Sequence, residues 1–141
     1  MDFEQARFNM VEQQIRTWEV LDQEVLDLLF EVRREDFVPL AYRSLAFADL
    51  EIPIGEGERM WTPKMEARVL QELDLTANEA ALEIGTGSGY LTALLARSCG
   101  VVTSVGVSSS AKIFSDAATA DCSTLYLSLS SWIGRKKRNA Y

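Results

Sequence analysis

The sequence predicts an α/β fold in which N-terminal helices precede a partial, truncated parallel sheet. A strand over residues 80–84 leads through a glycine-rich turn into a helix over 90–97. A second strand, rich in β-branched residues, follows at 101–105, so that these segments form one β-α-β unit. We divide the chain into a helical and loop-rich extension (1–75), the β-α-β unit (76–106) and an atypical tail (107–141), which is Ser-rich and then basic.

Two helices are predicted at the start of the chain. Apolar residues over 2–18 have helical spacing, and Asp22 is placed to cap a second helix that continues to Val32. That helix must end before Pro39. We expect turns and short extended pieces over 37–57, because proline and glycine punctuate this segment.

A third helix is predicted to begin at Thr62. Threonine is a good N-cap residue, and Pro63 suits the first helical position because its missing N–H would have no helical partner there. The helix leads into the strand at 80–84. Its predicted buried stripe consists of Met65, Val69, Leu70 and Leu73.

Gly85, Gly87 and Gly89 form a Gly-x-Gly-x-Gly turn between the predicted strand and helix. Glycines let the backbone turn sharply and bring its N–H groups, and the positive end of the next helix, against a ligand. A phosphate-binding P-loop has Lys and Ser/Thr after its last glycine, whereas Tyr90 and Leu91 follow here. A dinucleotide-binding turn has the spacing Gly-x-Gly-x-x-Gly. Neither class matches this turn.

The acidic residue before the turn indicates the class of ligand. Glu83 would repel a pyrophosphate and attract a cofactor with a positive centre. S-adenosylmethionine fits, because it has a sulfonium, an α-ammonium and no phosphate. A glycine turn that binds no ligand is the alternative interpretation. The predicted cofactor-binding residues are Glu83, Gly85, Thr86, Gly87, Gly89 and Tyr90.

The composition opposes several other functions. A net charge of −7 argues against a nucleic-acid partner, because phosphate contacts need clustered Lys and Arg. The chain has no histidine, and Cys99 and Cys122 lack metal-binding spacing, which excludes zinc sites and His-based catalysis. No secretory signal and no membrane-spanning apolar run is found, so we expect a cytoplasmic protein with no membrane partner.

Taken in order, these segments resemble the protein-L-isoaspartate O-methyltransferase family over roughly residues 9–105. The resemblance implies a Rossmann-like S-adenosylmethionine-dependent methyltransferase fold with an N-terminal helical extension. It also implies protein repair, in which a methyl group is transferred to the carboxyl of isoaspartyl residues in a damaged protein or peptide. The matching segments are MVEQQIR (10–16), VLD (20–22), VL (25–26), REDFVP (34–39), AFAD (46–49), IPIGEG (52–57) and the glycine motif.

Two positions depart from the family pattern. The family has Gly-x-Gly-Gln-Thr-Ile-Ser-x-Pro where this chain has GEGERMWTP (55–63), which places Trp61 at the active-site Ser. Thr62 offers a hydroxyl one residue later and is the candidate catalytic residue, although the shift changes the direction of the side chain. The acid that would hold the ribose hydroxyls is replaced by Gly106. A catalytically silent fragment or a partner-binding module is therefore the alternative function.

Residues 107–141 do not continue the family pattern. They contain five basic and two acidic residues, and apolar alternation over 125–129 predicts a strand after a weak helix near 111–120. We hypothesise that this segment is an altered reading frame or an unrelated ending. Truncation would leave Leu82 and Ile84 on a strand with an open edge, which predicts self-association.

Overall fold

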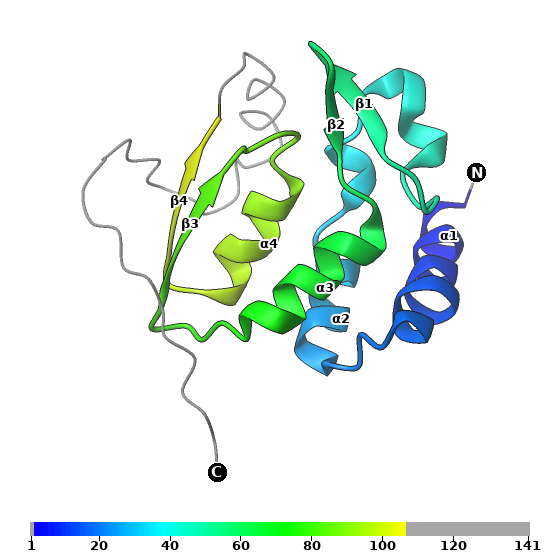
Figure 1. The fold of residues 1–141 in the computed structure, drawn as a ribbon. Coiled ribbons are helices and arrows are strands. Elements are labelled where there is room, and N and C mark those ends of the chain that lie inside the picture. Colours follow the sequence, from blue (N-terminus) through cyan, green and yellow to red (C-terminus); the bar gives the residue numbers. More distant parts are fainter. Residues whose placement is uncertain (1, 107–141) are drawn as a thin grey trace.

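The structure is a computed structural model and describes residues 2–106. Figure 1 shows helix α4 between the strand pair β3–β4 and the helices α2 and α3. The helices are α1 (Phe3–Asn9), α2 (Gln23–Glu31), α3 (Pro63–Leu73) and α4 (Tyr90–Ser98), with shorter segments η1 (Met10–Ile15), η2 (Arg16–Trp18), η3 (Arg34–Asp36) and η4 (Leu40–Leu45). The strands are β1 (Ile52–Gly55), β2 (Glu58–Met60), β3 (Ala80–Ile84) and β4 (Val101–Val105). The expected helix 111–120, strand 125–129 and Cys122 lie outside the described residues.

The predicted α/β architecture is confirmed, with helices before a parallel β-α-β unit. The helical stretch expected over 2–18 begins where the Asp2 side chain accepts the Gln5 N–H at 3.1 Å. It continues through η1, which is a π-helix, and η2, which is a 3₁₀ helix, and ends at Glu19 with φ +62°. Of the helices formed by the described residues, none has the length and hydropathy needed to cross a membrane.

The predicted helix caps are confirmed. The Asp22 carboxylate accepts the Glu24 N–H at 2.9 Å, which fixes the start of α2. The Thr62 hydroxyl accepts the Met65 N–H at 3.4 Å, and Pro63 occupies the first position of α3.

The predicted buried stripe of α3 is wrong in part. Met65 and Leu73 are 44% and 43% exposed, whereas Leu70 is buried as expected. The helix is rotated so that Glu66 faces the core, because Arg34 lies there and donates a hydrogen bond to its carboxyl group. The buried residues of α3 are Pro63, Glu66, Ala67 and Leu70.

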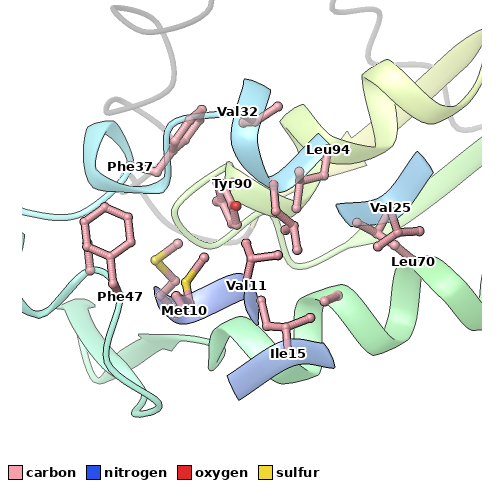
Figure 2. Close-up of a cluster of buried hydrophobic side chains, with 14 of the residues drawn as sticks. Met10, Val11, Ile15, Val25, Val32, Phe37, Phe47, Leu70, Tyr90 and Leu94 are labelled. Atoms are coloured by element: carbon pink, nitrogen blue, oxygen red, sulfur yellow. The ribbon is translucent and has the colours of Figure 1, made fainter. Parts of the chain in front are cut away.

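One hydrophobic core joins the extension to the β-α-β unit. Met10, Val11 and Ile15 of η1 are fully buried, and Figure 2 shows them in one cluster with Tyr90 and Leu94 of α4. Such burial stabilises a fold by about 25 cal/mol for each Å² of apolar surface removed from water. The extension therefore supplies the hydrophobic cover for α4, the helix that follows the glycine turn.

The two sheets of the described residues each contain two strands. β1 and β2 form an antiparallel hairpin, and β3 and β4 pair in parallel with Ala80 opposite Val101. Side chains alternate between the two faces of a strand. The face of β3–β4 toward α4 carries Glu83 and Ser104, which are both buried. On the other face Leu82, Ile84 and Val101 are 52%, 77% and 61% exposed.

Candidate functional site

The glycine turn links the end of β3 to the start of α4. The Gly85 N–H donates to the Val105 carbonyl at 2.7 Å, and the Gly89 N–H donates to the Thr86 carbonyl at 2.8 Å. The φ angles of Gly85, Gly87 and Gly89 are +98°, +52° and +83°. A Cβ at Gly85 would meet no atom of residues 2–106 within 4 Å. Position 85 therefore needs glycine for its backbone conformation, and the space beside it is open.

Hairpin β1–β2 reaches the glycine turn. A Cβ at Gly87 would lie 3.6 Å from Cδ1 of Ile54, which is a buried residue of β1. The turn thus lies between its own helix and a strand of the N-terminal extension. The extension takes part in shaping this site as well as in covering the core.

Glu83 is held inside a small hydrogen-bond network. Its carboxylate accepts hydrogen bonds from the hydroxyls of Thr92 on α4 and Ser104 on β4. The hydroxyls of Ser104 and Thr86 are 2.7 Å apart, which extends the network to the glycine turn. Burial raises the pKa of Glu83, while the two hydroxyl hydrogen bonds act in the opposite direction. Glu83 thereby ties both strands and the helix together directly beneath the turn.

Sequence reasoning missed Thr92 and Ser104 as members of this site. A signal was present, since both are polar residues among apolar neighbours in a short helix and a β-branched strand. Two neutral hydroxyls can satisfy the hydrogen bonds of a buried carboxylate without the free-energy cost of burying a second charged group.

The Tyr90 side chain points into the core and leaves only its backbone at the turn. The residue is almost fully buried, and Figure 2 shows its ring among Phe37, Met10 and Val11. The ring centroids of Tyr90 and Phe37 are 5.5 Å apart in an edge-to-face arrangement. The Tyr90 hydroxyl is buried without a hydrogen-bond partner among the described residues, and burial raises its pKa. A role for Tyr90 in cofactor binding can therefore involve only its main chain.

A buried ion pair lies behind the turn. The guanidinium of Arg34 donates to the carboxylate of Glu66, and both side chains are almost fully buried. Burial raises the pKa of Glu66 more than Arg34 lowers it, and nearby Glu83 raises it further. Burial therefore favours the protonated form of Glu66, and the hydrogen bond between the two side chains joins η3 to α3.

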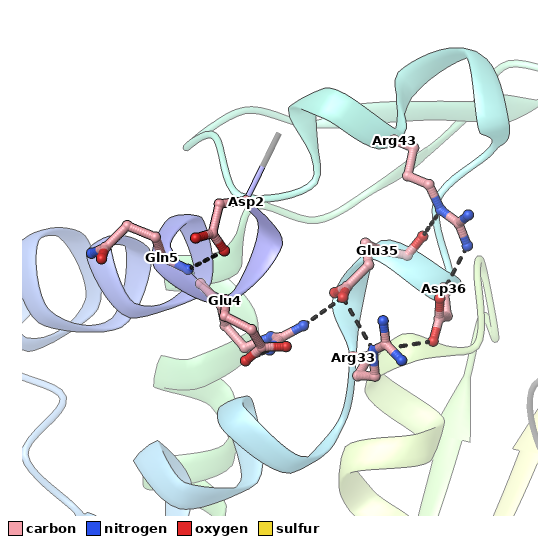
Figure 3. Close-up of polar contacts among 8 residues, drawn as sticks. Asp2, Glu4, Gln5, Arg33, Glu35, Asp36 and Arg43 are labelled. Atoms are coloured by element: carbon pink, nitrogen blue, oxygen red, sulfur yellow. Dashed lines mark hydrogen bonds and ion pairs between the residues drawn. The ribbon is translucent and has the colours of Figure 1, made fainter.

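A second buried ion pair anchors the N-terminus. Arg7 donates to Glu35, and both side chains are nearly inaccessible to solvent. Figure 3 shows Glu35 with Arg33 and Asp36, which extend this cluster toward the surface. The cluster stabilises α1 against η3 and lies outside the glycine turn.

Thr62 is placed at the start of α3, where its hydroxyl caps the helix. The neighbouring Trp61 side chain is half-exposed, and its carbonyl accepts a hydrogen bond from Arg34 at 2.6 Å. Gly106 directly follows β4. A Cβ there would lie only 3.1 Å from the hydroxyl oxygen of Thr86, so the two residues are in close contact.

The sequence matches the family model of Protein-L-isoaspartate(D-aspartate) O-methyltransferase (PCMT) over residues 5–127. The chain belongs to this family. The resemblance noted over 9–105 is confirmed, and the family match continues to residue 127.

Relatives of this family are similar over the N-terminal part of the chain. The protein-L-isoaspartate O-methyltransferase of Petrotoga mobilis is 45% identical over 96 residues, which are 68% of this chain and 45% of that protein. The enzyme of Aeropyrum pernix is 43% identical over 94 residues, which are 67% of this chain and 36% of that protein. The chain therefore spans less than half the length of these curated relatives.

Solved structures of the family share the fold. The Plasmodium falciparum protein-L-isoaspartate O-methyltransferase in complex with S-adenosyl-L-homocysteine superposes with a TM-score of 0.66 at 19% identity. The match covers 84% of this chain and 57% of that one. A second protein-L-isoaspartate O-methyltransferase superposes with a TM-score of 0.59 at 25% identity, covering 79% of this chain and 36% of that one.

The departures from the family motif predict an altered acceptor side. Trp61 stands at the position that the family pattern gives to serine, and the hydroxyl of Thr62 is engaged as a helix cap. Gly106, which lies against Thr86, stands where the resemblance predicts a ribose-binding acid. The glycine turn carries the motif that the resemblance predicts, so the expected departures concern the acceptor and the ribose rather than the turn.

Proposed function

We propose that this chain binds S-adenosylmethionine at the glycine turn and methylates the carboxyl of isoaspartyl residues in proteins or peptides. One observation carries the proposal: three glycines with positive φ follow β3 and lead directly into α4. The family membership and the S-adenosyl-L-homocysteine complex of the Plasmodium falciparum relative support it.

The described residues fit one end of this cofactor better than the other. The open space at Gly85 allows a ligand to approach the main chain, and the N-terminus of α4 adds polar N–H groups. Glu83 acts beneath the turn, where it fixes Thr92 and Ser104. We assign the turn to the amino-acid end of the cofactor. At the ribose end, Gly106 offers no carboxylate.

Methyl transfer places modest chemical demands on the protein. The cofactor supplies an electrophilic methyl group on a sulfonium, and an acceptor carboxylate oxygen displaces the neutral thioether. A carboxylate is already a nucleophile at neutral pH, so the protein has to align the two reactants and exclude water. A chain without histidine is compatible with this requirement.

Calorimetric titration of the full chain with S-adenosylhomocysteine is the first test. Saturable binding at one site per chain is expected, and the absence of heat at millimolar ligand would contradict the proposal. Adenosine serves as a control, because it lacks the amino-acid end that we assign to the glycine turn. Adenosine should bind much more weakly.

The second candidate is a catalytically silent member of the family that binds a protein partner. Gly106 and the exposed residues Leu82, Ile84 and Val101 favour it. Incubation with a radiolabelled methyl donor and an isoaspartyl peptide separates the two, with the normal aspartyl peptide as control. Methylation of the isoaspartyl peptide alone supports the enzyme. Binding of S-adenosylhomocysteine without methylation supports the silent protein.

The altered reading frame of residues 107–141 remains a hypothesis. Translation of the coding nucleotide sequence in the other two frames is its test. An acidic residue just after β4, followed by family-like strands, is the result expected, and unrelated sequence would reject the idea.

A further inference from the structure

The guanidinium of Arg34 lies where the N-terminal extension meets the glycine turn. Its Nε donates to the Ala46 carbonyl at 2.8 Å and its Nη2 to the Trp61 carbonyl at 2.6 Å. Its Nη1 donates to the carboxylate of Glu66. The cation also lies over the ring of Tyr90, with Cζ 5.0 Å from the centroid. One fully buried side chain therefore contacts four residues, which come from three separate segments.

Two of these segments border the proposed site. Tyr90 is the first residue of α4 and comes directly after Gly89 of the turn. Trp61 precedes Thr62, the cap of α3 and the candidate catalytic residue. Because Arg34 contacts both, a shift of its guanidinium displaces the turn relative to the start of α3.

We propose that Arg34 is a positioning residue that holds the cofactor turn and the start of α3 in the relative arrangement required for methyl transfer. The inference rests on the proposed function. It gives the buried Arg34–Glu66 pair a role other than stability. Such a role is needed because a buried ion pair is often no more stabilising than a pair of apolar residues.

Lysine cannot replace this arginine. A guanidinium is planar and presents several N–H donors in fixed directions, so that it can bond to three oxygens while its face lies on a ring. An ammonium is a compact charge without a face. Arg34→Lys therefore keeps a cation beside Glu66 but loses part of the contacts to Ala46, Trp61 and Tyr90.

Arg7 provides a matched control. It is also a buried arginine, it pairs with the buried Glu35, and it lies over the Phe47 ring at 5.7 Å. Its ion pairs are with Glu4 and Glu35, far in sequence from the turn. Arg7→Lys makes the same chemical change in a similar environment, so it separates a general loss of packing from a loss of positioning.

Amide hydrogen exchange on the full, ligand-free chain is the first measurement. Each variant is measured at the same number of degrees below its own melting temperature. Arg34→Lys should then exchange amide hydrogens faster than Arg7→Lys in two windows, residues 61–66 and 85–92. Equal exchange of both windows in the two variants would overturn the proposal. This readout needs no ligand, so it decides the positioning role even where the proposed function fails.

The affinity for S-adenosylhomocysteine is the second measurement. A displacement on the order of 1 Å in such a site reduces activity up to about a hundredfold. We expect Arg34→Lys to bind at least about tenfold more weakly than Arg7→Lys. Equal affinities would reject the inference while leaving the proposed function intact, whereas no binding by the unaltered chain rejects the proposed function.

Glu66→Gln is a milder substitution that tests the proposal if Arg34→Lys does not fold. Glu66→Gln keeps one oxygen acceptor for Arg34 but replaces the carboxyl group of the pair with a neutral amide. It should accelerate exchange in the same two windows by a smaller factor. Glu31→Gln, in the exposed pair with Arg97, is its control and should change neither window.

Discussion

The N-terminal extension and the β-α-β unit bury different kinds of side chain. In the extension, apolar residues such as Met10 and Leu26 are buried together with two arginine–glutamate pairs. In the β-α-β unit, β3 and β4 direct Glu83 and Ser104 toward α4, and leave apolar side chains on the opposite face. The extension thus buries its charged pairs completely, whereas the outer apolar face of the strand pair is not covered by the described residues.

This difference predicts that substitutions in the extension mainly change stability, whereas substitutions in the β-α-β unit mainly change ligand binding. Deleting one half of a buried ion pair leaves an uncompensated charge in a closed core, so the extension should respond strongly to single substitutions. The β-α-β unit holds its network by neutral hydroxyls and a turn, so changes there should alter ligand binding before they alter folding. Each of the following predictions tests one side of this comparison.

The largest effect is expected for Glu35→Ala. It removes the buried carboxylate partner of Arg7 and leaves only the exposed carboxylate of Glu4 to pair with it. Breaking a buried pair in this way destabilises by about 3–5 kcal/mol. Glu31→Ala, which breaks an exposed pair with Arg97, should cost less than about 1 kcal/mol. Urea unfolding monitored by circular dichroism measures both. Similar losses in the two variants would show that the extension does not depend on its buried charges.

Gly85→Ala should reduce binding more than stability. Position 85 has φ +98°, and forcing a side chain into such a conformation costs on the order of 1–3 kcal/mol. Gly57→Ala is the control, because Gly57 has φ +80° and equally open space in the β1–β2 turn. Both variants should melt at similar temperatures, and Gly85→Ala alone should lose S-adenosylhomocysteine binding. Loss of binding in both would assign the hairpin to the cofactor site.

The stability of the protein should fall as pH rises above the ordinary pKa of a glutamate. The pKa values of Glu66 and Glu83 are raised in the folded chain, chiefly by burial. The folded state therefore holds these protons more tightly than the unfolded state, and raising the pH favours unfolding. In Glu66→Gln the side chain at position 66 cannot titrate. The pH dependence of the unfolding free energy should therefore become less steep in this variant, without disappearing.

Denaturant unfolding of both proteins at intervals between about pH 5 and pH 8 measures this slope. Glu31→Gln is the control, because Glu31 is exposed and should leave the slope unchanged. A Glu66→Gln protein with the slope of the unaltered chain would contradict the assignment to the buried pair.

Self-association should depend on the outer face of β3. Ile84 is 77% exposed on a strand whose edge has no partner among the described residues, and such edges favour pairing with other chains. Ile84→Thr keeps a β-branched side chain and lowers the apolar area. Sedimentation velocity should show a smaller weight-average mass for Ile84→Thr than for the control Leu21→Thr, which alters an exposed residue outside the sheet. Equal masses would contradict an association through β3.

The smallest effect is expected for Tyr90→Phe. The hydroxyl of Tyr90 is buried without a hydrogen-bond partner among the described residues, and an unsatisfied buried group costs about 1–3 kcal/mol. Its removal should leave the protein equally stable or more stable, by up to about 1 kcal/mol. The ring contacts to Phe37 and Arg34 remain in this variant. A clear destabilisation in thermal unfolding would show that the hydroxyl is used.

Local features of the sequence predicted local features of the structure. Asp22 and Thr62 cap helices because a cap depends on residues two or three positions away. The glycine turn was predictable for the same reason, since positive φ is a property of single positions. The order of helices and strands followed from apolar periodicity along the chain.

Other features that sequence reasoning missed depend on a partner that is distant in the sequence. Glu66 is buried only because Arg34, 32 positions earlier, meets it in the core. Tyr90 turns inward because its ring finds Phe37 and Arg34, and this changes its expected role at the turn. Periodicity assigns each helix an apolar face but does not specify which charged residue a remote segment will neutralise there.

The hydrogen bonds of Glu83 have a consequence for how this sequence can vary. Its carboxylate shares one buried site with the hydroxyls of Thr92 and Ser104. The three residues lie on β3, α4 and β4, which are consecutive elements of the β-α-β unit. A change at Glu83 leaves both buried hydroxyls without their carboxylate acceptor, and a change at either hydroxyl leaves the buried carboxylate with one donor fewer. The three positions should therefore be inherited together, and homologues that replace the glutamate with an apolar residue should also have lost both hydroxyls.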